Sequence, residues 1–303
     1  MADYFPEWIR RTWGSGREFA DTKAILQDLG LHTVCQSARC PNIAECWRRH
    51  TATFMVLGNV CTRHCAFCSV TPGTPGPPEA DEPGKVAEAV RRLGIAHTVV
   101  TMVTRDDLPD GGAEHMACTV AAIRTTNPGT TIEVLVSDFE GAREAIRSVL
   151  DAAPEVFGHN IETVERLYPT LRDARYDYGR SLDVLRFAAD QGTSAIIKSA
   201  FMVGHGESEG EVRQTLEDLH GAGCTAVAIG QYLRPTGDQP AVVEFVHPGQ
   251  FEAYERLAYE IGFAFAATGP FVRSSYRSEE VLAARPYPNT AKEMQVNKLS
   301  DSF

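Results

Sequence analysis

The chain has no long apolar segment and no excess of positive charge. No run of 18 apolar residues occurs, so no helix is expected to span a membrane. The first eight residues, 1–8, lack both the basic start and the apolar stretch of a secretory signal. The net charge of −11 opposes binding to the phosphate backbone of nucleic acid. We therefore expect a cytoplasmic protein with neither a membrane nor nucleic acid as its partner.

Cysteine is the residue whose abundance needs an explanation. Without an export signal, the eight cysteines are expected in a reducing compartment, where disulfides are rare. Cysteines in such a compartment more often bind metal. The other residue classes, 43% apolar and 23% charged, are those of an ordinary globular protein. A chain of 303 residues is long enough for two average domains or one large α/β barrel.

Short β-rich runs alternate with helical patterns along most of the chain, and several runs are continuously apolar, as strands buried on both faces are. The expected strands are Ala52–Leu57, His97–Val103, Thr131–Val136, Glu155–His159, Ser194–Phe201 and Thr225–Tyr232. The expected helices cover 83–93, 112–126, 140–151, 181–191, 208–222 and 248–262. Such repeats imply a parallel sheet with right-handed crossovers. The pattern predicts an α/β fold, a partial (β/α)6 barrel.

Three regions follow from this pattern. Residues 1–50 form an N-terminal extension that carries cysteines, residues 51–265 form the partial barrel, and residues 266–303 form a C-terminal extension. We expect the two extensions to cover the open end of the barrel. In barrels, the loops that follow the carboxyl ends of the strands hold the reactive groups.

One such loop contains Cys61, Cys65 and Cys68 in the spacing C-x3-C-x2-C, directly after the first expected strand. Three thiolates can hold a four-iron cluster and leave one iron without a protein ligand, where a cofactor can bind. The alternative, a zinc site, would need a fourth Cys or His at regular spacing. His64 lies between two of the cysteines and would strain the loop. The spacing therefore favours an iron–sulfur cluster.

A second triplet, Cys35, Cys40 and Cys46, has the spacing C-x4-C-x5-C, which matches no common zinc pattern. Three thiolates outside the barrel suggest a second cluster that is again one ligand short. Three buried cysteines without a role are the alternative on spacing alone. Cys118 and Cys224 are expected to be small buried residues with no role.

The first triplet is the motif of radical S-adenosylmethionine (SAM) enzymes, and the two triplets together resemble those of the lipoyl synthases. The resemblance covers about residues 6 to 277. The further matching segments are Pro6–Arg10, Ala52–Gly58, Arg105–Ala113, His159–Thr163, Gly230–Pro235 and the R-S-S-Y segment Arg273–Tyr276. The chain departs from the usual family residues at Met102, Gly158, Ala200 and His205, and after Tyr276 it lacks Ala-Gly-Glu.

The resemblance implies two 4Fe-4S clusters and assigns their ligands. Cys61, Cys65 and Cys68 would hold the cluster that binds SAM, and the other triplet would hold an auxiliary cluster. Ser275 would be the fourth ligand of the auxiliary cluster. A serine oxygen binds iron more weakly than a thiolate does, which suits a ligand that must leave during turnover. From the sequence alone, Ser274 and Ser275 would more simply cap a turn.

Five further residues are candidates for contacts with SAM. Phe67 would pack near the adenine. Gly111 and Gly112 lack β-carbons and so let backbone groups approach the methionine end of the cofactor. Asn160 and Lys198, at expected strand ends, would contact the ribose or the carboxylate.

The implied activity is the insertion of two sulfur atoms at C6 and C8 of a protein-bound octanoyl-lysine, giving the lipoyl group. Two molecules of SAM would be used per product, and no acid–base residue is required because an aliphatic C–H bond has no useful acidity. The implied partners are octanoylated lipoyl domains of 2-oxo-acid dehydrogenase complexes or the glycine-cleavage H protein. An electron donor such as ferredoxin or flavodoxin is also implied. Two alternatives are another radical SAM sulfur-inserting enzyme and a non-catalytic, zinc-stabilised binding module.

Overall fold

The computed structural model describes residues 5–10 and 16–283. Its main sheet has the strand order β1-β2-β5-β6-β7-β8-β9-β10. Neighbouring strands are parallel except for β1, which pairs antiparallel with β2 at one edge. The strands of this sheet are β1 (His32–Thr33), β2 (Thr53–Val56), β5 (His97–Met102), β6 (Thr131–Leu135), β7 (Val156–Gly158), β8 (Ile196–Val203), β9 (Ala226–Gln231) and β10 (Phe265–Gly269). β3 (Val60–Cys61) and β4 (Thr71–Pro72) form a separate parallel pair.

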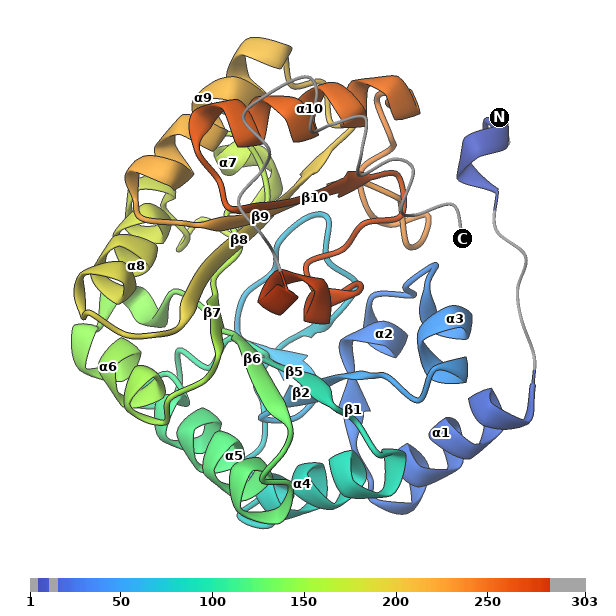
Figure 1. Cartoon of the computed structure of the whole chain (residues 1–303), viewed down its shortest axis with the longest axis vertical. Helices are drawn as coiled ribbons and strands as arrows, with labels where there is room; N and C mark the ends of the chain where they lie inside the picture. Colours follow the sequence, from blue (N-terminus) through green and yellow to red (C-terminus); the bar gives the residue numbers. More distant parts are fainter. Residues whose placement is uncertain (1–4, 11–15, 284–303) are drawn as a thin grey trace.

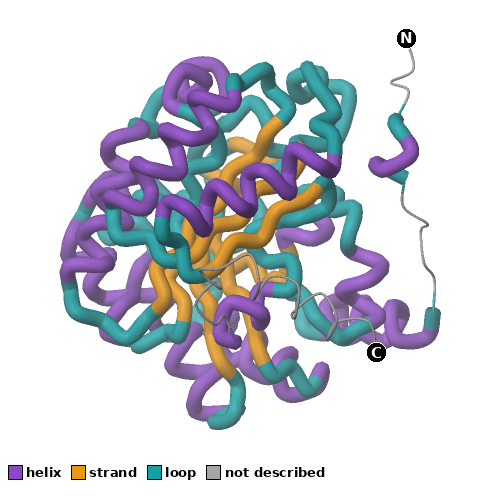
Figure 2. The backbone as a smooth tube through the Cα atoms, turned by 45° about the horizontal axis from the view of Figure 1, so that its top comes forward, coloured by secondary structure: helices purple, strands orange, loops and turns teal. Residues whose placement is uncertain are grey.

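Helices cover the outer side of the curved sheet (Figure 1). Figure 2 shows the strands in the centre of the molecule and the helices around them. The helices are α1 (Arg17–Asp28), α2 (Val34–Ser37), α3 (Ile43–Arg48), α4 (Glu82–Leu93), α5 (Ala113–Thr126), α6 (Arg143–Asp151), α7 (Tyr168–Leu171), α8 (Tyr178–Asp190), α9 (Glu209–Gly221) and α10 (Pro248–Ile261). Short 3-10 helices are η1 (Glu7–Ile9), η2 (Phe139–Gly141), η3 (Glu165–Leu167) and η4 (Ser278–Ala283). Among the described residues, no helix is both long and apolar enough to cross a bilayer.

The predicted α/β barrel pattern is confirmed, because every expected strand and helix is present with ends shifted by only a few residues. At α9, for example, the Ser208 hydroxyl accepts the Glu211 N–H, and the Glu211 carboxylate accepts the Ser208 N–H. This reciprocal capping fixes where the helix begins. The sheet also contains β10, which no pattern predicted. Its sequence, Phe-Ala-Ala-Thr-Gly, is rich in residues that are depleted in strands, so only its pairing with β9 makes it one.

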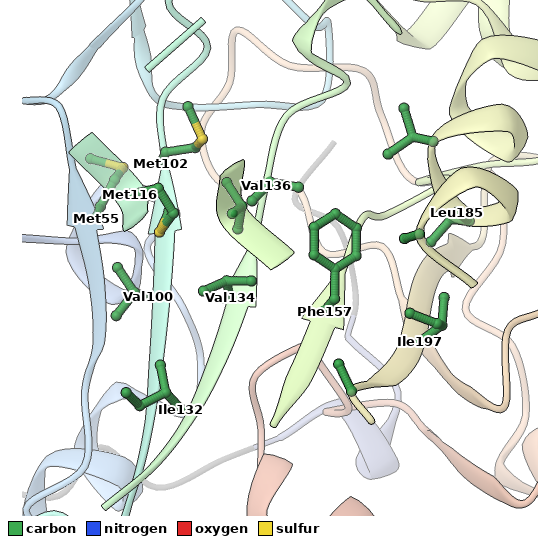
Figure 3. Close-up of a cluster of buried hydrophobic side chains, with 14 of the residues drawn as sticks. Met55, Val100, Met102, Met116, Ile132, Val134, Val136, Phe157, Leu185 and Ile197 are labelled. Atoms are coloured by element: carbon green, nitrogen blue, oxygen red, sulfur yellow. The ribbon is translucent and has the colours of Figure 1, made fainter. Parts of the chain in front are cut away.

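The core lies between the sheet and its helices (Figure 3). Val134 on β6, Phe157 on β7 and Ile197 on β8 belong to this core, together with Leu185 of α8. Side chains alternate along a strand, so the neighbours of these residues point to the inside of the barrel. Val156, one such neighbour, packs with Ala226 and with Val281 of η4. The short helix η4 therefore packs against the inner face of the sheet.

Candidate functional site

The first cysteine loop follows β2 at the carboxyl end of the sheet. Cys65 is buried, and Cys61 and Cys68 are half-buried. Each of the three sulfurs accepts one backbone N–H at 3.4 Å, from Arg63 to Cys61, from Asp173 to Cys65 and from Val70 to Cys68. N–H groups pointed at cysteine sulfurs are the contacts through which proteins stabilise and tune an iron–sulfur cluster.

The segment that follows α7 supports this loop from the side. The Ala66 N–H donates to the Leu171 carbonyl (2.8 Å), and the Asp173 carboxylate accepts the His64 N–H (2.7 Å). Arg172, between them, places its guanidinium 3.5 Å from the ring centre of Tyr176. The Arg172 charge opposes the rise in the pKa of Cys65. A loop held on both flanks keeps its three thiols in a defined arrangement.

The three thiols are electrostatic neighbours. Burial, and then the charges of Cys65 and Cys61, raise the pKa of Cys68 to about 12. Burial also raises the pKa of Cys65, with smaller contributions from Glu162 and Cys61. The chain alone therefore disfavours three thiolates here, and a bound metal cluster would supply the positive charge that stabilises them.

The second triplet lies on α2, on α3 and between them. Cys35 is buried in α2, Cys46 belongs to α3, and Cys40 precedes α3. Burial and then Cys40 raise the pKa of Cys35 to about 11. Burial, and then Cys35 and Cys40, raise the pKa of Cys46 to about 12. These thiols lie close enough to repel one another as thiolates. The ligands of one cluster must lie similarly close together.

The R-S-S-Y segment docks onto this second triplet. Thr53, the first residue of β2, donates its hydroxyl to Ser275 Oγ (2.9 Å), and it also lies within hydrogen-bonding reach of the Cys35 thiol. The Tyr276 hydroxyl donates to the carboxylate of Glu45, beside Cys46, at 2.9 Å. Two further contacts join the same segments, Asn42 Nδ2 to the Phe271 carbonyl (2.7 Å) and Arg49 to Glu279 (2.8 Å). Ser275 thus lies one hydrogen-bonded side chain away from the Cys35 thiol.

The two cysteine segments lie next to each other. The Ser69 hydroxyl, directly after Cys68, donates to the Ser37 carbonyl of α2 at 2.5 Å. In the part of the chain that the structure describes, no three His, Cys, Asp or Glu side chains converge closely enough to hold a single metal ion. A four-iron cluster takes each thiolate on a different iron, so its ligands are neighbours without converging on one point. The donor chemistry of both triplets fits such a cluster.

Gly111 and Gly112 form a left-handed turn before α5, with φ values of +63° and +91°. A β-carbon on Gly112 would lie 2.3 Å from Leu57 Cδ1, so a larger residue cannot fit without displacing Leu57. Gly111 lines a cavity of about 230 Å³ between the loops that follow β5 and β6, together with Asp106, Ser137 and Phe139. This cavity lies at the carboxyl ends of the strands, where barrels bind their ligands.

Phe67 and Asn160 lie around the first cysteine loop. Phe67 is half-buried and packs against a small apolar cluster of Val164, Leu167 and Leu171. Asn160, after β7, donates to the Glu162 carboxylate at 3.1 Å. Burial raises the pKa of Glu162, and the Glu162 charge in turn raises the pKa of Cys68. Asn160 is therefore linked to the cysteine loop through Glu162.

Lys198 lies deeper in the barrel. It follows Ile197 on β8, so its side chain points to the inside of the sheet. Its ammonium binds both carboxylate oxygens of Glu133 on β6, at 2.9 and 3.0 Å, and both side chains are buried. A ligand that approached Lys198 would have to share its ammonium with Glu133.

The four positions that depart from the usual family residues lie at separate places in the sheet and the loops that follow it. A β-carbon on Gly158 would lie 3.2 Å from the Val134 carbonyl, beside the inner face of the sheet. Ala200 is buried on β8, and Met102 lies against the Gly112 turn. His205 stacks on Tyr232 with ring centres 4.0 Å apart, and burial lowers its pKa to about 4.

Several residues around the two triplets carried no recognisable sequence signal. Thr53 lies in the matching segment Ala52–Gly58, and Glu45 precedes Cys46. Nothing in the sequence shows that their side chains form hydrogen bonds with the R-S-S-Y segment. Asp173 and Arg172 lie more than 100 residues from the cysteines they support. Cys118 is exposed on α5, so the expectation that it is buried is wrong; Cys224 is buried as expected.

Comparisons with known proteins give a consistent result. Residues 55–219 match the family described as the Radical SAM superfamily. The chain is 49% identical over 275 residues to a lipoyl synthase of Rubrobacter xylanophilus, covering 91% of this chain and 85% of the relative. It is 50% identical over 278 residues to a lipoyl synthase of Caldanaerobacter subterraneus, covering 92% of this chain and 97% of the relative.

Solved structures support the fold. The crystal structure of methylornithine synthase (PylB) matches 91% of this chain and 95% of its own chain, with a TM-score of 0.52 and 13% identity. That of Streptococcus suis SuiB bound to S-adenosylmethionine matches 77% of this chain and 55% of its own, with a TM-score of 0.54 and 11% identity. At these identities, the likeness is one of architecture.

Proposed function

Since the chain belongs to the lipoyl synthase family of radical SAM enzymes, we propose that it inserts two sulfur atoms, at C6 and C8, into a protein-bound octanoyl-lysine. The family's activity is radical SAM sulfur insertion in lipoyl biosynthesis. A 4Fe-4S cluster and SAM are its cofactors, and an octanoylated protein is its substrate. When bound, the cluster and SAM supply the radical chemistry needed for C–H bonds that no acid or base could activate.

The proposal of a second cluster rests on the docking of the R-S-S-Y segment onto the second cysteine triplet. Thr53 connects Ser275 to Cys35, and Tyr276 binds Glu45 beside Cys46. These contacts bring the Ser275 hydroxyl within one side chain of the Cys35 thiol and anchor its segment beside Cys46. They support a second 4Fe-4S cluster held by Cys35, Cys40, Cys46 and Ser275, and this auxiliary cluster is the proposed source of sulfur.

The first triplet then holds the cluster that binds SAM. Cys61, Cys65 and Cys68 are its proposed ligands, and backbone N–H groups point at their sulfurs. Phe67, Gly111, Gly112, Asn160 and Lys198 remain proposed cofactor contacts. Of these, the Gly111–Gly112 turn is supported by its position on a cavity, and Asn160 by its link to Glu162.

Replacing two C–H bonds by two C–S bonds requires two molecules of SAM per product. The proposed carriers are lipoyl domains of 2-oxo-acid dehydrogenase complexes or the glycine-cleavage H protein, and the proposed reductant is a ferredoxin or flavodoxin. A reducing compartment such as the cytoplasm suits six thiolate ligands. The two ends of the chain, 1–50 and 266–303, would form the auxiliary-cluster region beside the barrel of residues 51–265. Contacts of Asn42, Glu45 and Arg49 with residues 271, 276 and 279 support the pairing of the two regions, while β10 extends the barrel to Gly269.

The direct test is anaerobic reconstitution with iron and sulfide, followed by reaction with SAM, dithionite and an octanoylated lipoyl-domain peptide. Mass spectrometry of the peptide should show two added sulfur atoms in the reduced dithiol form, with two hydrogens fewer after oxidation to the disulfide. A sulfur-inserting enzyme with another substrate would leave the peptide unchanged while still consuming SAM. That outcome would contradict the proposed substrate.

Metal analysis of the reconstituted protein is expected to give about eight irons per chain and no zinc, because each triplet would hold a four-iron cluster. About four irons would mean that only one triplet assembles a cluster. Zinc without iron would instead support the alternative of a zinc-stabilised binding module.

Substitutions of Ser275 distinguish a cluster ligand from a turn residue. If Ser275 only capped a turn, Ser275→Ala would cost under about 1 kcal/mol of stability and little activity. As the weak fourth ligand, its loss should stop sulfur insertion. Ser275→Cys should keep the iron and the release of 5′-deoxyadenosine but yield little lipoyl product, because a thiolate holds the iron more firmly.

Ser274→Ala is the matched control, since it removes the neighbouring hydroxyl from the same segment. It should retain both clusters and the lipoyl product. Normal product from both Ser275 variants, with unchanged cluster spectra, would show that Ser275 is not a ligand.

A further inference from the structure

Leu57 joins β2 to the first cysteine loop in a conformation that L-amino acids rarely adopt. Its φ is +68°, in the left-handed region, and Gly58 follows with φ +87°. Leu57 is also almost fully buried, at 2% exposure. A branched, buried residue in this region is strained, and such strain persists only where the surroundings enforce it.

Both backbone polar groups of Leu57 are bound by buried charged side chains. The Leu57 N–H donates to Glu82 Oε2 at 2.8 Å, from the start of α4. The Leu57 carbonyl accepts Arg105 Nη1 at 3.3 Å, from the loop after β5. Glu82 is 6% exposed and Arg105 is 1% exposed. Neither Glu82 nor Arg105 is among the cofactor contacts proposed above.

The two charged side chains are themselves fixed. Glu82 Oε2 also contacts His115 Nε2 of α5 at 2.7 Å. Arg105 donates twice to the Asp107 carboxylate, at 2.8 and 2.7 Å, and once to the Gly76 carbonyl at 2.9 Å. The position of Leu57 is therefore set by four separate parts of the chain, which contain Gly76, Glu82, Asp107 and His115.

The side chain of Leu57 connects this arrangement to the proposed SAM site. Its Cδ1 lies 2.3 Å from the position that a β-carbon of Gly112 would take, so it fills the space directly against the Gly112 backbone. On its other side, the chain passes from Gly58 to Cys61 within three residues. A shift of Leu57 would consequently move the cysteine loop and the glycine turn relative to each other.

We propose that Glu82 and Arg105 are positioning residues that hold Leu57 in its strained conformation and thereby keep the first cysteine loop aligned with the Gly111–Gly112 turn. The inference rests on the proposed roles of that loop and of that turn in binding SAM. Without the carboxylate, Leu57 relaxes toward an extended conformation, and the two parts of the SAM site separate.

Glu82→Ala is expected to raise KM for SAM about tenfold in 5′-deoxyadenosine formation, since small misplacements at a site have large effects. kcat and the iron content should change little. Glu82→Gln keeps an oxygen that accepts the Leu57 N–H and should restore most of the affinity. The matched control is Glu88→Ala, which removes a carboxylate of the same helix that pairs with Arg91 and Arg92 on the surface.

A measurement on the metal-free chain tests the same point without activity. Hydrogen exchange of a peptide that covers residues 54–60 should become faster in Glu82→Ala, because the Leu57 N–H loses its acceptor. It should stay unchanged in Glu88→Ala. Faster exchange with an unaltered KM for SAM would overturn the proposal, since Glu82 would then only satisfy a buried N–H.

The strain is tested by combining Glu82→Ala with two truncations of Leu57. Leu57→Ala and Leu57→Gly both remove the buried side chain, but only glycine adopts a positive φ without strain. Glu82→Ala should therefore raise KM in the Leu57→Ala background and have little effect in the Leu57→Gly background. Equal effects in both would overturn the proposal. The KM for SAM can show this dependence on Glu82 and Leu57 while the unaltered protein makes no lipoyl product. That result would refute the proposed function alone.

Discussion

Cys65→Ala is expected to abolish cleavage of SAM. Cys65 is the buried member of the first triplet, and its sulfur accepts the Asp173 N–H. Three thiolates are the fewest that hold a four-iron cluster with one open iron, so the loss of one should prevent assembly. The fall in 5′-deoxyadenosine should exceed the roughly 100-fold cost typical of losing an outer partner of a metal ligand. Cys61→Ala and Cys68→Ala should behave alike.

Cys118→Ala is the control for this experiment. Cys118 is exposed on α5 and outside both triplets, so its removal tests the effect of losing a thiol as such. We expect its iron content and its release of 5′-deoxyadenosine to match those of the unaltered protein. Normal release of 5′-deoxyadenosine from any of the three loop variants would contradict the assignment of the first triplet.

The simultaneous change of Cys35, Cys40 and Cys46 to alanine should separate the two halves of the reaction. The first cluster has its ligands on another segment, so this variant should still release 5′-deoxyadenosine with about half of the iron. It should transfer no sulfur to the octanoylated peptide. The expected loss of lipoyl product is complete, because the proposed sulfur source is gone.

The structure adds one condition to this prediction. Ser69, next to Cys68, contacts the Ser37 carbonyl of α2, so a collapse of the second segment could disturb the first loop. The SAM-dependent EPR signal of the reduced protein therefore has to be recorded in parallel, and it should be preserved. Lipoyl product from a variant with an intact first cluster would mean that the second triplet is not the sulfur source.

Much of the barrel could be predicted because its signals are local. The runs that became β5, β6 and β8 are rich in Val, Ile, Thr and other residues that favour strands, and this pattern does not depend on what lies next to them in space. Ser208 and Glu211 define the start of α9 within four residues. β10 was missed because its alanines and glycine become a strand only when β9 pairs with them.

By itself, the sequence determined the number, kind and spacing of the donors in the two cysteine triplets, since C-x3-C-x2-C and C-x4-C-x5-C are short-range patterns. Only the tertiary structure decided what surrounds them. Ser275 contacts Thr53, the neighbour of Cys35, across a separation of 222 residues, and Asp173 contacts Cys65 across a separation of 108 residues. Leu57 owes its left-handed backbone to Glu82 and Arg105 rather than to its own preference. Local propensity contains none of these contacts, because each exists only after the barrel has brought distant loops to the same end of the sheet.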